Sequence, residues 1–328
     1  MMRPTRIAAT ALAVLLVTAA CGGKQTNDSA EQSSGSCEAG EGRITIATGN
    51  TGGVYYTLGG GLAQLISDNT PLKASAAETG ASVQNIQQLV AGDYDIAFAL
   101  ADTAADAVEG KASFDGKPQD IAALARIYPN YTQVVVRADS GINSVADMKG
   151  KSISTGSPKS GTEVIANRLL EAAGLSSSDI SAQRLALRPT VDQMKAGQID
   201  GLVWSGGLPT PELTDLTTSL GDDVKFIDIS DLLDDMKKVN QVYEEGAIPA
   251  DTYGLPADVP TIVVPNLLLV TKDFPEGNAC AITNLVFDKK DDLAKVHKAA
   301  NALDREIAAD TDPVELHPGA AQALEATK

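Results

Sequence analysis

The chain has 328 residues, of which 43% are hydrophobic and 4% aromatic, and it carries a formal net charge of −17. This length is sufficient for one large domain or two lobes of ordinary size, and the apolar fraction is sufficient for a hydrophobic core. The acidic charge excludes nucleic-acid binding as the main function, because no basic surface is available to neutralise phosphate groups.

The N-terminus has the layout of a secretory signal peptide. Arg3 and Arg6 precede an apolar run of 14 residues that ends in small residues before Cys21. A membrane-spanning helix needs about 20 apolar residues, so this run indicates export. The stretch VTAAC resembles the lipobox of bacterial lipoproteins, although Thr18 stands where Leu is commonest. We therefore expect a signal peptide over residues 1–20 and a lipidated Cys21 that anchors the protein to the outer face of the cell membrane; an ordinary secretory signal is the alternative.

Residues 21–42 are polar and rich in Gly and Ser, without hydrophobic periodicity, which predicts a flexible tether. The two remaining cysteines are Cys37 and Cys280. Because export places both in an oxidising compartment, we expect a disulfide between them, with two unrelated thiols as the alternative. Such a bond would hold the C-terminal segment against the N-terminal lobe.

Short apolar runs alternate with amphipathic ones along the rest of the chain, which is typical of α/β domains with mostly parallel sheets. A first series predicts strands over residues 44–48, 74–78 and 95–100, and helices over 54–67, 82–91 and from Asp102 onward. A second series predicts strands over residues 152–154, 183–187, 200–204 and 224–229, and helices over 162–173 and 191–195. Residues 132–137 and 260–271 are predicted to cross between the two halves as a hinge, and the residues after Asp273, including 289–309, are predicted to be helical.

The two series resemble each other. ITIATGNTGGVYY matches SISTGSPKSGTEV, and AGDYDIAFAL matches AGQIDGLVWS in the same order. This similarity predicts two lobes of similar build, the alternative being the turn chemistry that α/β units share in general. The predicted boundaries are a signal peptide (1–20), a tether (21–42), lobe I (43–135), lobe II (136–262), and a return to lobe I with C-terminal helices (263–328).

The glycine-rich stretch GNTGGVYYTLGGGL, residues 49–62, lacks the features of a nucleotide site. It contains no Lys, which excludes a P-loop, and its glycines are not spaced as G-x-G-x-x-G. The chain has no G-x-S-x-G and no C-x-x-C, and its only histidines, His297 and His317, lie far from the glycine-rich turns. We therefore predict that the protein is not an enzyme and uses no cofactor and no metal.

Three strand-to-helix junctions predict an anion site instead. They are residues 49–55, 79–85 and 157–162, and each is rich in small residues, hydroxyls and amides. A helix start exposes unpaired backbone amides and carries partial positive charge, so it binds anions without a cationic side chain. If the two lobes face each other, these junctions meet at one cleft that suits a small carboxylate. Trp204, the only tryptophan, either walls this cleft or is buried between lobe helices.

Several stretches together resemble the TAXI type of TRAP-transporter solute receptor. They are GNTGGVYY, ETGASVQNIQQL, GDYDIAFALAD, ADSGINSVADMKGKSISTGSPKSGTE, GQIDGLVWSGGLP, IPADTYG and HPGA. The resemblance implies a type II periplasmic-binding-protein fold, with two α/β lobes joined by a two-strand hinge and a ligand cleft between them. It implies capture of a small organic acid, such as glutamate, glutamine or a 2-oxoglutarate-like compound, and its delivery to a sodium-driven membrane permease by a receptor that we expect to be a monomer.

The resemblance also implies a set of ligand-binding residues. They are Asn50, Thr51, Gly53, Tyr55, Thr79, Ser82, Asn85, Ser157, Ser160, Gly161, Thr162, Trp204, Gly206 and Gly207. The chain departs from the family pattern at Ala81 and Lys159, where glycine is usual, and near its end, where an aromatic pair is missing. The first two departures touch the cleft, so they bear on which ligand is bound.

Other functions fit parts of the same pattern. A receptor for an ABC importer or for a sensor kinase would have the same two-lobed fold, and neighbouring genes would distinguish these partners. A transferase or hydrolase on this fold would turn over a candidate acid, but the glycine-rich turns supply no plausible base. A lipid-anchored scaffold would bind no small acid at all.

Overall fold

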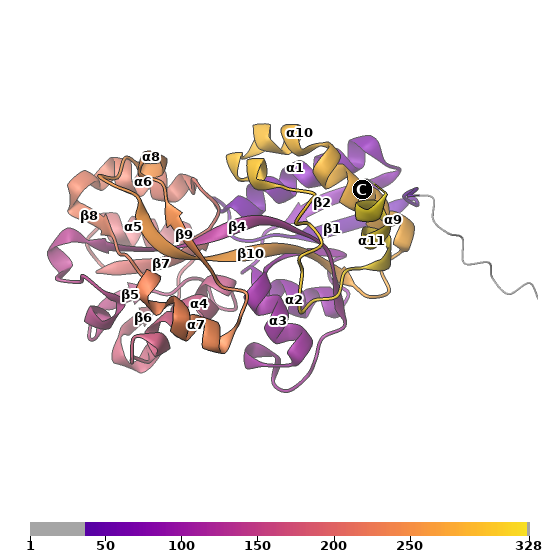
Figure 1. Cartoon of the computed structure of the whole chain (residues 1–328). Helices are drawn as coiled ribbons and strands as arrows, with labels where there is room; N and C mark the ends of the chain where they lie inside the picture. Colours follow the sequence, from indigo (N-terminus) through magenta and orange to yellow (C-terminus); the bar gives the residue numbers. More distant parts are fainter. Residues whose placement is uncertain (1–36, 327–328) are drawn as a thin grey trace, which may run out of the picture. The chain divides into compact units, whose positions relative to one another are not determined.

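The computed structural model describes residues 37–326 (Figure 1). The predicted signal peptide, the lipidation of Cys21 and most of the predicted tether lie outside the described residues. Within them, every helix is too short or too polar to cross a bilayer.

One mixed sheet of ten strands organises the described chain, in the order β2-β1-β3-β10-β4-β7-β5-β6, with β8 paired to β4 and β9 paired to β10. The strands are β1 (Gly42–Ala47), β2 (Leu72–Ala77), β3 (Ile96–Leu100), β4 (Ile121–Arg137), β5 (Ser152–Ser154), β6 (Ser181–Gln183), β7 (Gly201–Gly206), β8 (Val224–Phe226), β9 (Glu244–Ile248) and β10 (Val259–Thr271). The helices are α1 (Val54–Asn69), α2 (Ser82–Val90), α3 (Ala101–Glu109), α4 (Gly161–Ala172), α5 (Leu187–Lys195), α6 (Pro211–Leu220), α7 (Leu233–Val239), α8 (Ala250–Tyr253), α9 (Glu276–Asp288), α10 (Lys290–Val296) and α11 (Pro318–Glu325).

The elements form two α/β lobes (Figure 1). In lobe I, β1 pairs in parallel with β2 and β3, and α1 to α3 follow these strands. In lobe II, β5 pairs in parallel with β6 and β7, and α4 to α6 follow in the same way. Helices α9 and α10 return to pack on α1. This arrangement confirms the predicted two-lobed α/β fold.

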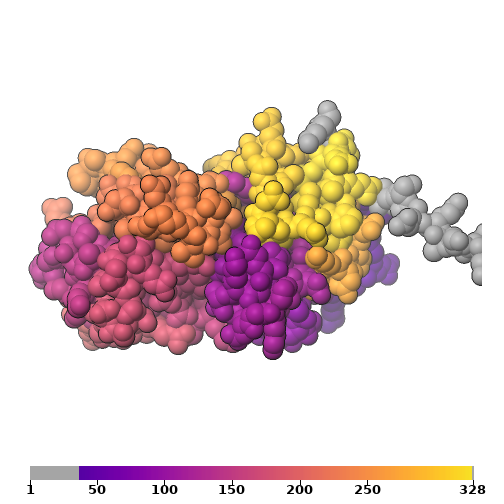
Figure 2. All heavy atoms as spheres, turned by 60° about the horizontal axis from the view of Figure 1, so that its bottom comes forward, coloured from indigo at the N-terminus to yellow at the C-terminus, as the bar shows by residue number. Residues whose placement is uncertain are grey.

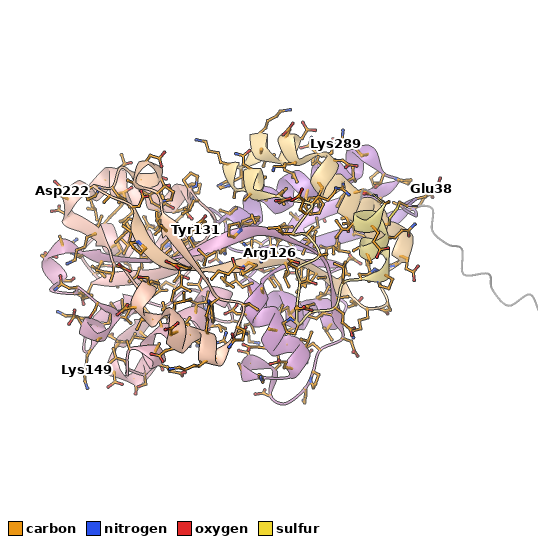
Figure 3. The ribbon with its side chains drawn as sticks, in the orientation of Figure 1. Glu38, Arg126, Tyr131, Lys149, Asp222 and Lys289 are labelled. Carbon is orange, nitrogen blue, oxygen red and sulfur yellow. A yellow bond between two sulfur atoms is a disulfide. The ribbon has the colours of Figure 1, made fainter. Side chains whose placement is uncertain are left out.

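Two long strands, β4 and β10, belong to both lobes. The part of β10 from Asn266 onward pairs with β3 of lobe I, whereas the part of β4 from Tyr131 onward pairs with β7 of lobe II. Arg126 and Tyr131 of β4 lie between the two lobes in Figure 3. Within the antiparallel pair that β4 and β10 form, Pro129 and Pro265 face each other, and the register shifts next to them. Proline has no N–H to donate, so the ladder between these strands is interrupted at this point.

Residues far apart in the sequence meet on the face shown in Figure 2. The purple residues of lobe I, the orange residues around α7 and the yellow C-terminal residues lie against one another there. A disulfide joins Cys37, which lies shortly before β1, to Cys280 of α9. The Gly40 amide also donates to Asn278 Oδ1 of α9 at 2.8 Å, so the segment before β1 is held to the C-terminal helices twice.

Two predicted elements were wrong. The apolar residues 185–187 lead into α5 and are not part of a strand, because β6 ends at Gln183. Residues 303–317 are not helical, although their composition resembles a helix. Their backbone bonds to β4 instead: Arg126 N–H donates to Ala308 O at 2.8 Å, and Ala123 N–H donates to Glu315 O at 2.9 Å. Tertiary pairing with a strand therefore overrides the helical pattern of this segment.

Candidate ligand-binding cleft

A cavity lies where the helix starts of lobe I meet the start of α4 and the end of β7. The empty space between its lining atoms, including the part open to solvent, is about 420 Å³. Its lining residues are Gly49, Asn50, Gly53, Val54, Tyr55, Gly80, Ala81, Ser82, Leu100, Asn130, Ser160, Gly161, Thr162, Trp204, Ser205 and Gly206. None of them carries a charged side chain at neutral pH, so the cavity is polar but uncharged.

Three helices begin at this cavity: α1 after Gly53, α2 after Ala81 and α4 after Ser160. The Ser160 hydroxyl caps α4 by accepting the Glu163 amide at 3.0 Å, whereas α1 and α2 have no side-chain cap. Among residues 37–326, the first two amides of α2 and of α4 have no protein acceptor. Such amides, reinforced by the helix dipoles, bind an anion without a cationic side chain. Because α4 belongs to the other lobe, these helix starts bring backbone amides of both lobes to one place.

Gly161 allows α4 to approach lobe I closely. A Cβ at this position would lie 2.5 Å from Leu100 Cδ1 and 2.7 Å from Ser82 Oγ. Both distances are shorter than van der Waals contact, so any larger residue would push the start of α4 away from lobe I. The glycine in SPKSGT is therefore a packing requirement of the closed cleft as well as a helix start.

A chain of hydrogen bonds at the cavity connects both lobes to β4 and β10. The Tyr55 hydroxyl donates to Asn266 Oδ1, and Asn266 Nδ2 donates to Asn130 Oδ1 at 2.8 Å. Asn130 Nδ2 in turn donates to the backbone oxygen of Ser205 at 3.2 Å. Burial raises the pKa of Tyr55 far above its ordinary value, which keeps it a neutral hydrogen-bond donor.

The two lobes contact each other around the cavity. Ser157 Oγ donates to Asn50 Oδ1 at 2.7 Å, and the backbone N–H of Gln84 in α2 donates to the backbone oxygen of Lys159 at 3.1 Å. Lys159 Nζ also donates to Gln87 Oε1 at 3.0 Å. The structure therefore shows the lobes closed on each other. These contacts lie around the cavity, and the residues that line the cavity carry no charged side chain.

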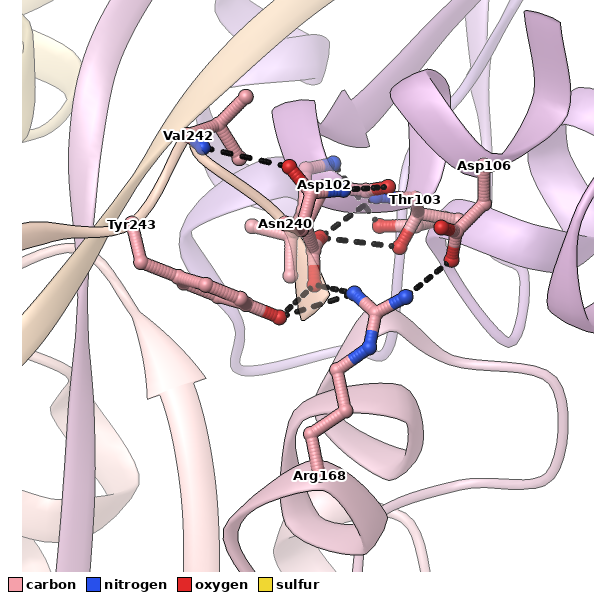
Figure 4. Close-up of polar contacts among 9 residues, drawn as sticks. Asp102, Thr103, Asp106, Arg168, Asn240, Val242 and Tyr243 are labelled. Carbon is pink, nitrogen blue, oxygen red and sulfur yellow. Dashed lines mark hydrogen bonds and ion pairs between the residues drawn. The ribbon is translucent and has the colours of Figure 1, made fainter. Parts of the chain in front are cut away.

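A buried ion cluster joins α3 of lobe I to α4 of lobe II (Figure 4). Arg168 Nη1 lies 2.9 Å from Asp102 Oδ2, and Arg168 Nη2 lies 2.6 Å from Asp106 Oδ2. Tyr243 donates to Asp102 Oδ2 at 2.5 Å and accepts from Arg168 at 2.9 Å. Asp102 is completely buried and the Arg168 side chain is 8% exposed.

The cluster holds two carboxylates against one guanidinium. Burial lowers the pKa of Arg168, but the charges of Asp102, Tyr243 and Asp106 raise it overall. Burial raises the pKa of Asp106, and the attraction of Arg168 only partly offsets this. Asp102 also accepts from the Thr103 backbone N–H at 2.6 Å and from the Tyr243 hydroxyl, and these hydrogen bonds offset its burial.

One wall of the cavity is formed by Trp204. Its indole N–H donates to Thr210 Oγ1 at 3.1 Å, and the far edge of the ring lies 3.6 Å from where a Cβ of Gly53 would be. Nearby, the Glu212 carboxylate lies against Gly52, at a position that a side chain there would fill. Burial raises the pKa of Glu212. Trp204 therefore closes the cleft against the start of α1, as one of the two sequence interpretations expected.

Neither histidine lies at the cavity. His297 Nδ1 accepts the Ala299 amide at 3.1 Å, so Nε2 carries the proton and donates to the Pro209 oxygen at 3.1 Å. His317 Nδ1 accepts the Gly319 amide at 3.2 Å at the start of α11. Burial lowers the pKa of both imidazoles, which keeps them neutral. In the part of the chain that the structure describes, no cluster of His, Cys, Asp or Glu is suited to hold a metal ion.

The structure brings most of the proposed ligand-binding residues to the cavity. Those that line it are Asn50, Gly53, Tyr55, Ser82, Ser160, Gly161, Thr162, Trp204 and Gly206. Those that do not line it are Thr51, Thr79, Asn85, Ser157 and Gly207. Asn85 has a structural role, because its Nδ2 donates to the Thr48 and Phe98 oxygens at 2.7 and 2.8 Å and so holds α2 to two strands.

Sequence reasoning missed several lining residues, above all Asn130, Ser205 and Leu100. Asn130 stands in the stretch YPNY of β4, where a polar residue between aromatic ones is the only visible signal. Ser205 follows Trp204 directly, and Leu100 ends an apolar strand. Their place in the cavity depends on how β4, β7 and β3 are brought together, which no short motif records.

Two α/β lobes, joined by two long strands and enclosing a polar cavity between them, define the periplasmic-binding-protein-like class. Within that class, the chain belongs to the NMT1-like family, which matches residues 46–326.

Solved structures share this fold at low sequence identity. MatC of Rhodopseudomonas palustris with bound malate is 13% identical, with a TM-score of 0.55 over 87% of this chain and 96% of that chain. PhnD1 of Prochlorococcus marinus in complex with methylphosphonate is 10% identical, with a TM-score of 0.53 over 80% and 90% of the two chains. A protein of Bordetella bronchiseptica RB50 is 22% identical, with a TM-score of 0.52 over 87% and 89%.

Proposed function

We propose that this protein is an extracytoplasmic solute-binding receptor that captures a small organic acid and delivers it to a TRAP transporter of the TAXI type. The observation that carries the proposal is the meeting of three helix starts from both lobes at one uncharged cavity. Backbone amides at these starts supply the positive potential for a carboxylate. The same fold holds malate in MatC and methylphosphonate in PhnD1, and both ligands are small anions.

The mechanism that we propose is closure of the lobes about β4 and β10. The hydrogen-bond ladder between β4 and β10 is interrupted at Pro129 and Pro265, so we expect the two strands to bend there. A ligand favours the closed form only if it binds that form more tightly than the open one. Contact with α1 and α2 on one side and α4 on the other meets this condition. The lobe boundaries that we propose are residues 43–135, 136–262 and 263–328, the same boundaries as in the sequence prediction.

The remaining parts of the proposal follow from the resemblance to TAXI-type receptors. Glutamate, glutamine and 2-oxoglutarate-like compounds are the first ligands to test. The partner is a sodium-driven membrane permease, the receptor is a monomer, and lipidated Cys21 with the tether after it holds the receptor at the outer face of the cell membrane.

A calorimetric titration of the purified mature protein tests the proposal. We expect at least one small carboxylic acid to bind with a dissociation constant at or below about 1 μM, equivalent to about 8 kcal/mol. The matched control is the same acid with every carboxylate converted to a primary amide, which has no negative charge and should bind at least about tenfold more weakly. Equal binding of acid and amide, or no binding by any small acid in a thermal-shift screen, would contradict the proposal.

A further inference from the structure

Two polar residues line the cavity without belonging to any helix start. Asn130 lies on β4 and Ser205 lies on β7, and they are 4% and 5% exposed. The two strands pair with each other, and Asn130 Nδ2 donates to the Ser205 oxygen at 3.2 Å. Asn130 and Ser205 therefore form one polar surface, which we call the cavity floor. A carboxylate held by the helix starts does not use this surface.

The hydrogen bonds of Asn266 fix the orientation of Asn130. Asn266 Nδ2 donates to the Tyr128 backbone oxygen at 2.7 Å, and a carbonyl can only accept, so the amide of Asn266 has one possible orientation. The other hydrogen of the same nitrogen is then donated to Asn130 Oδ1 at 2.8 Å. Asn130 must therefore present its NH₂ group toward Ser205 and the cavity. Of its two hydrogens, one is used on the Ser205 oxygen, which leaves one donor.

The Ser205 hydroxyl has no hydrogen-bond partner among the described residues, although it is buried. Its backbone is fully engaged, since its N–H donates to Thr162 Oγ1 at 3.3 Å and its oxygen accepts from Asn130. Buried polar groups in native proteins are nearly always paired, so an unpaired hydroxyl in a cavity wall indicates a partner that enters with the ligand. Ser205 and Asn130 thus offer two donors side by side and no negative charge.

We propose that Asn130 and Ser205 bind an oxygen substituent of the ligand, so that the receptor selects hydroxy or oxo acids over amino acids of the same carbon skeleton. The inference rests on the proposed function, because it takes the carboxylate to be held by the helix starts. A hydroxyl or carbonyl oxygen accepts from both groups. An ammonium group has only donors, so it would face the remaining N–H of Asn130, and no carboxylate lines the cavity to pair with it.

The test uses acids that differ only at one carbon. The first set is propionate, lactate and alanine; the second is succinate, malate and aspartate; the third is glutarate, 2-hydroxyglutarate and glutamate. In the set whose skeleton fits the cavity, calorimetry should show the hydroxy acid binding about tenfold or more tightly than both other members, as expected for a buried hydrogen bond that is gained or lost. An amino acid that binds as tightly as its hydroxy acid would overturn the inference.

A pair of matched variants assigns the effect to the floor. Ser205→Ala should lower the affinity for the hydroxy acid about tenfold and leave the unsubstituted acid nearly unchanged. Thr132→Val is the control, because Thr132 lies directly opposite Ser205 in the β4–β7 ladder and also has a buried, unpaired hydroxyl, but it does not line the cavity. It should leave the preference intact, and thermal unfolding of both variants checks that they fold.

The outcomes separate the two proposals. If no acid of any set binds, the proposed function fails, and the inference that rests on it fails with it. If acids bind and Ser205→Ala leaves the ratio between the hydroxy and unsubstituted acids unchanged, the function stands and only the role of the floor is wrong. Loss of the preference in Ser205→Ala but not in Thr132→Val supports the inference.

Discussion

Helix α4 contacts lobe I in two chemically different ways. At its first turn, residues 160–162 line a cavity without charged side chains, and the first two backbone amides of the helix have no acceptor among residues 37–326. About two turns later, Arg168 is buried between Asp102 and Asp106 of α3 and is fully engaged. The groups of the ion cluster pair with one another across the two lobes, whereas the cavity has backbone donors without an acceptor among the described residues. Part of the contact between the lobes is therefore stabilised by side chains of the protein alone.

The largest effect should come from removing the guanidinium. Arg168→Met leaves two buried carboxylates facing each other without a cation, and we expect a loss of about 3–5 kcal/mol in the free energy of unfolding. Urea denaturation at neutral pH measures it. The control is Arg43→Met, which changes an exposed arginine on β1 and should have little effect. Equal stability of the two variants would show that the cluster does not hold the lobes.

The next effect separates closure from folding. Gly161→Ala places a methyl group within 2.5 Å of Leu100 Cδ1, and relieving that contact costs about 1–3 kcal/mol in the closed form. Ligand affinity should fall about 5- to 150-fold, with a larger radius of gyration in X-ray scattering.

Gly60→Ala is the matched control, since nothing lies within 4 Å of a Cβ at that position on α1. It should bind ligand normally and gain about 0.5–1 kcal/mol of stability. Unchanged affinity in Gly161→Ala would show that the start of α4 does not contact lobe I in the liganded form.

The pH dependence of stability should report the second carboxylate of the cluster. Burial raises the pKa of Asp106 above its ordinary 3.8. The folded protein therefore holds this proton more tightly than the unfolded chain, so the stabilisation is complete below the unfolded pKa and is lost as the pH rises through the folded pKa. Asp106→Asn cannot lose a proton. Its stability relative to the wild type should thus increase as the pH rises above about 4 in urea denaturation; a constant difference would mean that burial does not raise the pKa of Asp106.

The smallest effect concerns the two positions where the chain departs from the TAXI-type pattern. Ala81 has φ 84° and ψ −150° and Lys159 has φ 63°, so both keep a conformation that favours glycine. Ala81→Gly should stabilise the protein by about 1 kcal/mol, because relief of the strain exceeds the entropy cost of glycine. Ala91→Gly, at an ordinary φ of −73° at the end of the same helix, should instead destabilise it by about 0.5–1 kcal/mol. Loss of stability in both variants would refute the strain at Ala81.

Much of the fold was predictable because its signals are local. The strand-to-helix turns at residues 49–55, 79–85 and 157–162 are each read within a few residues, and α1, α2 and α4 begin where these turns predict. The periodicity of apolar residues is equally local, and it predicted most strands and helices of both lobes, but it missed α6, α7 and β9 and wrongly extended a strand over residues 185–187. It failed at residues 303–317, where bonds to β4 decide the conformation.

The sequence by itself determined the two α/β halves and the small-residue turns at which α1, α2 and α4 begin, because turn chemistry and hydrophobic periodicity act over short stretches. Only the tertiary structure decided which polar groups share the cavity. Asn130 and Asn266 are 136 positions apart, and Arg168 and Asp102 are 66 apart. Whether such residues meet depends on the pairing of β4 with β10 and on the closing of one lobe against the other, and neither is encoded in the neighbourhood of any single residue.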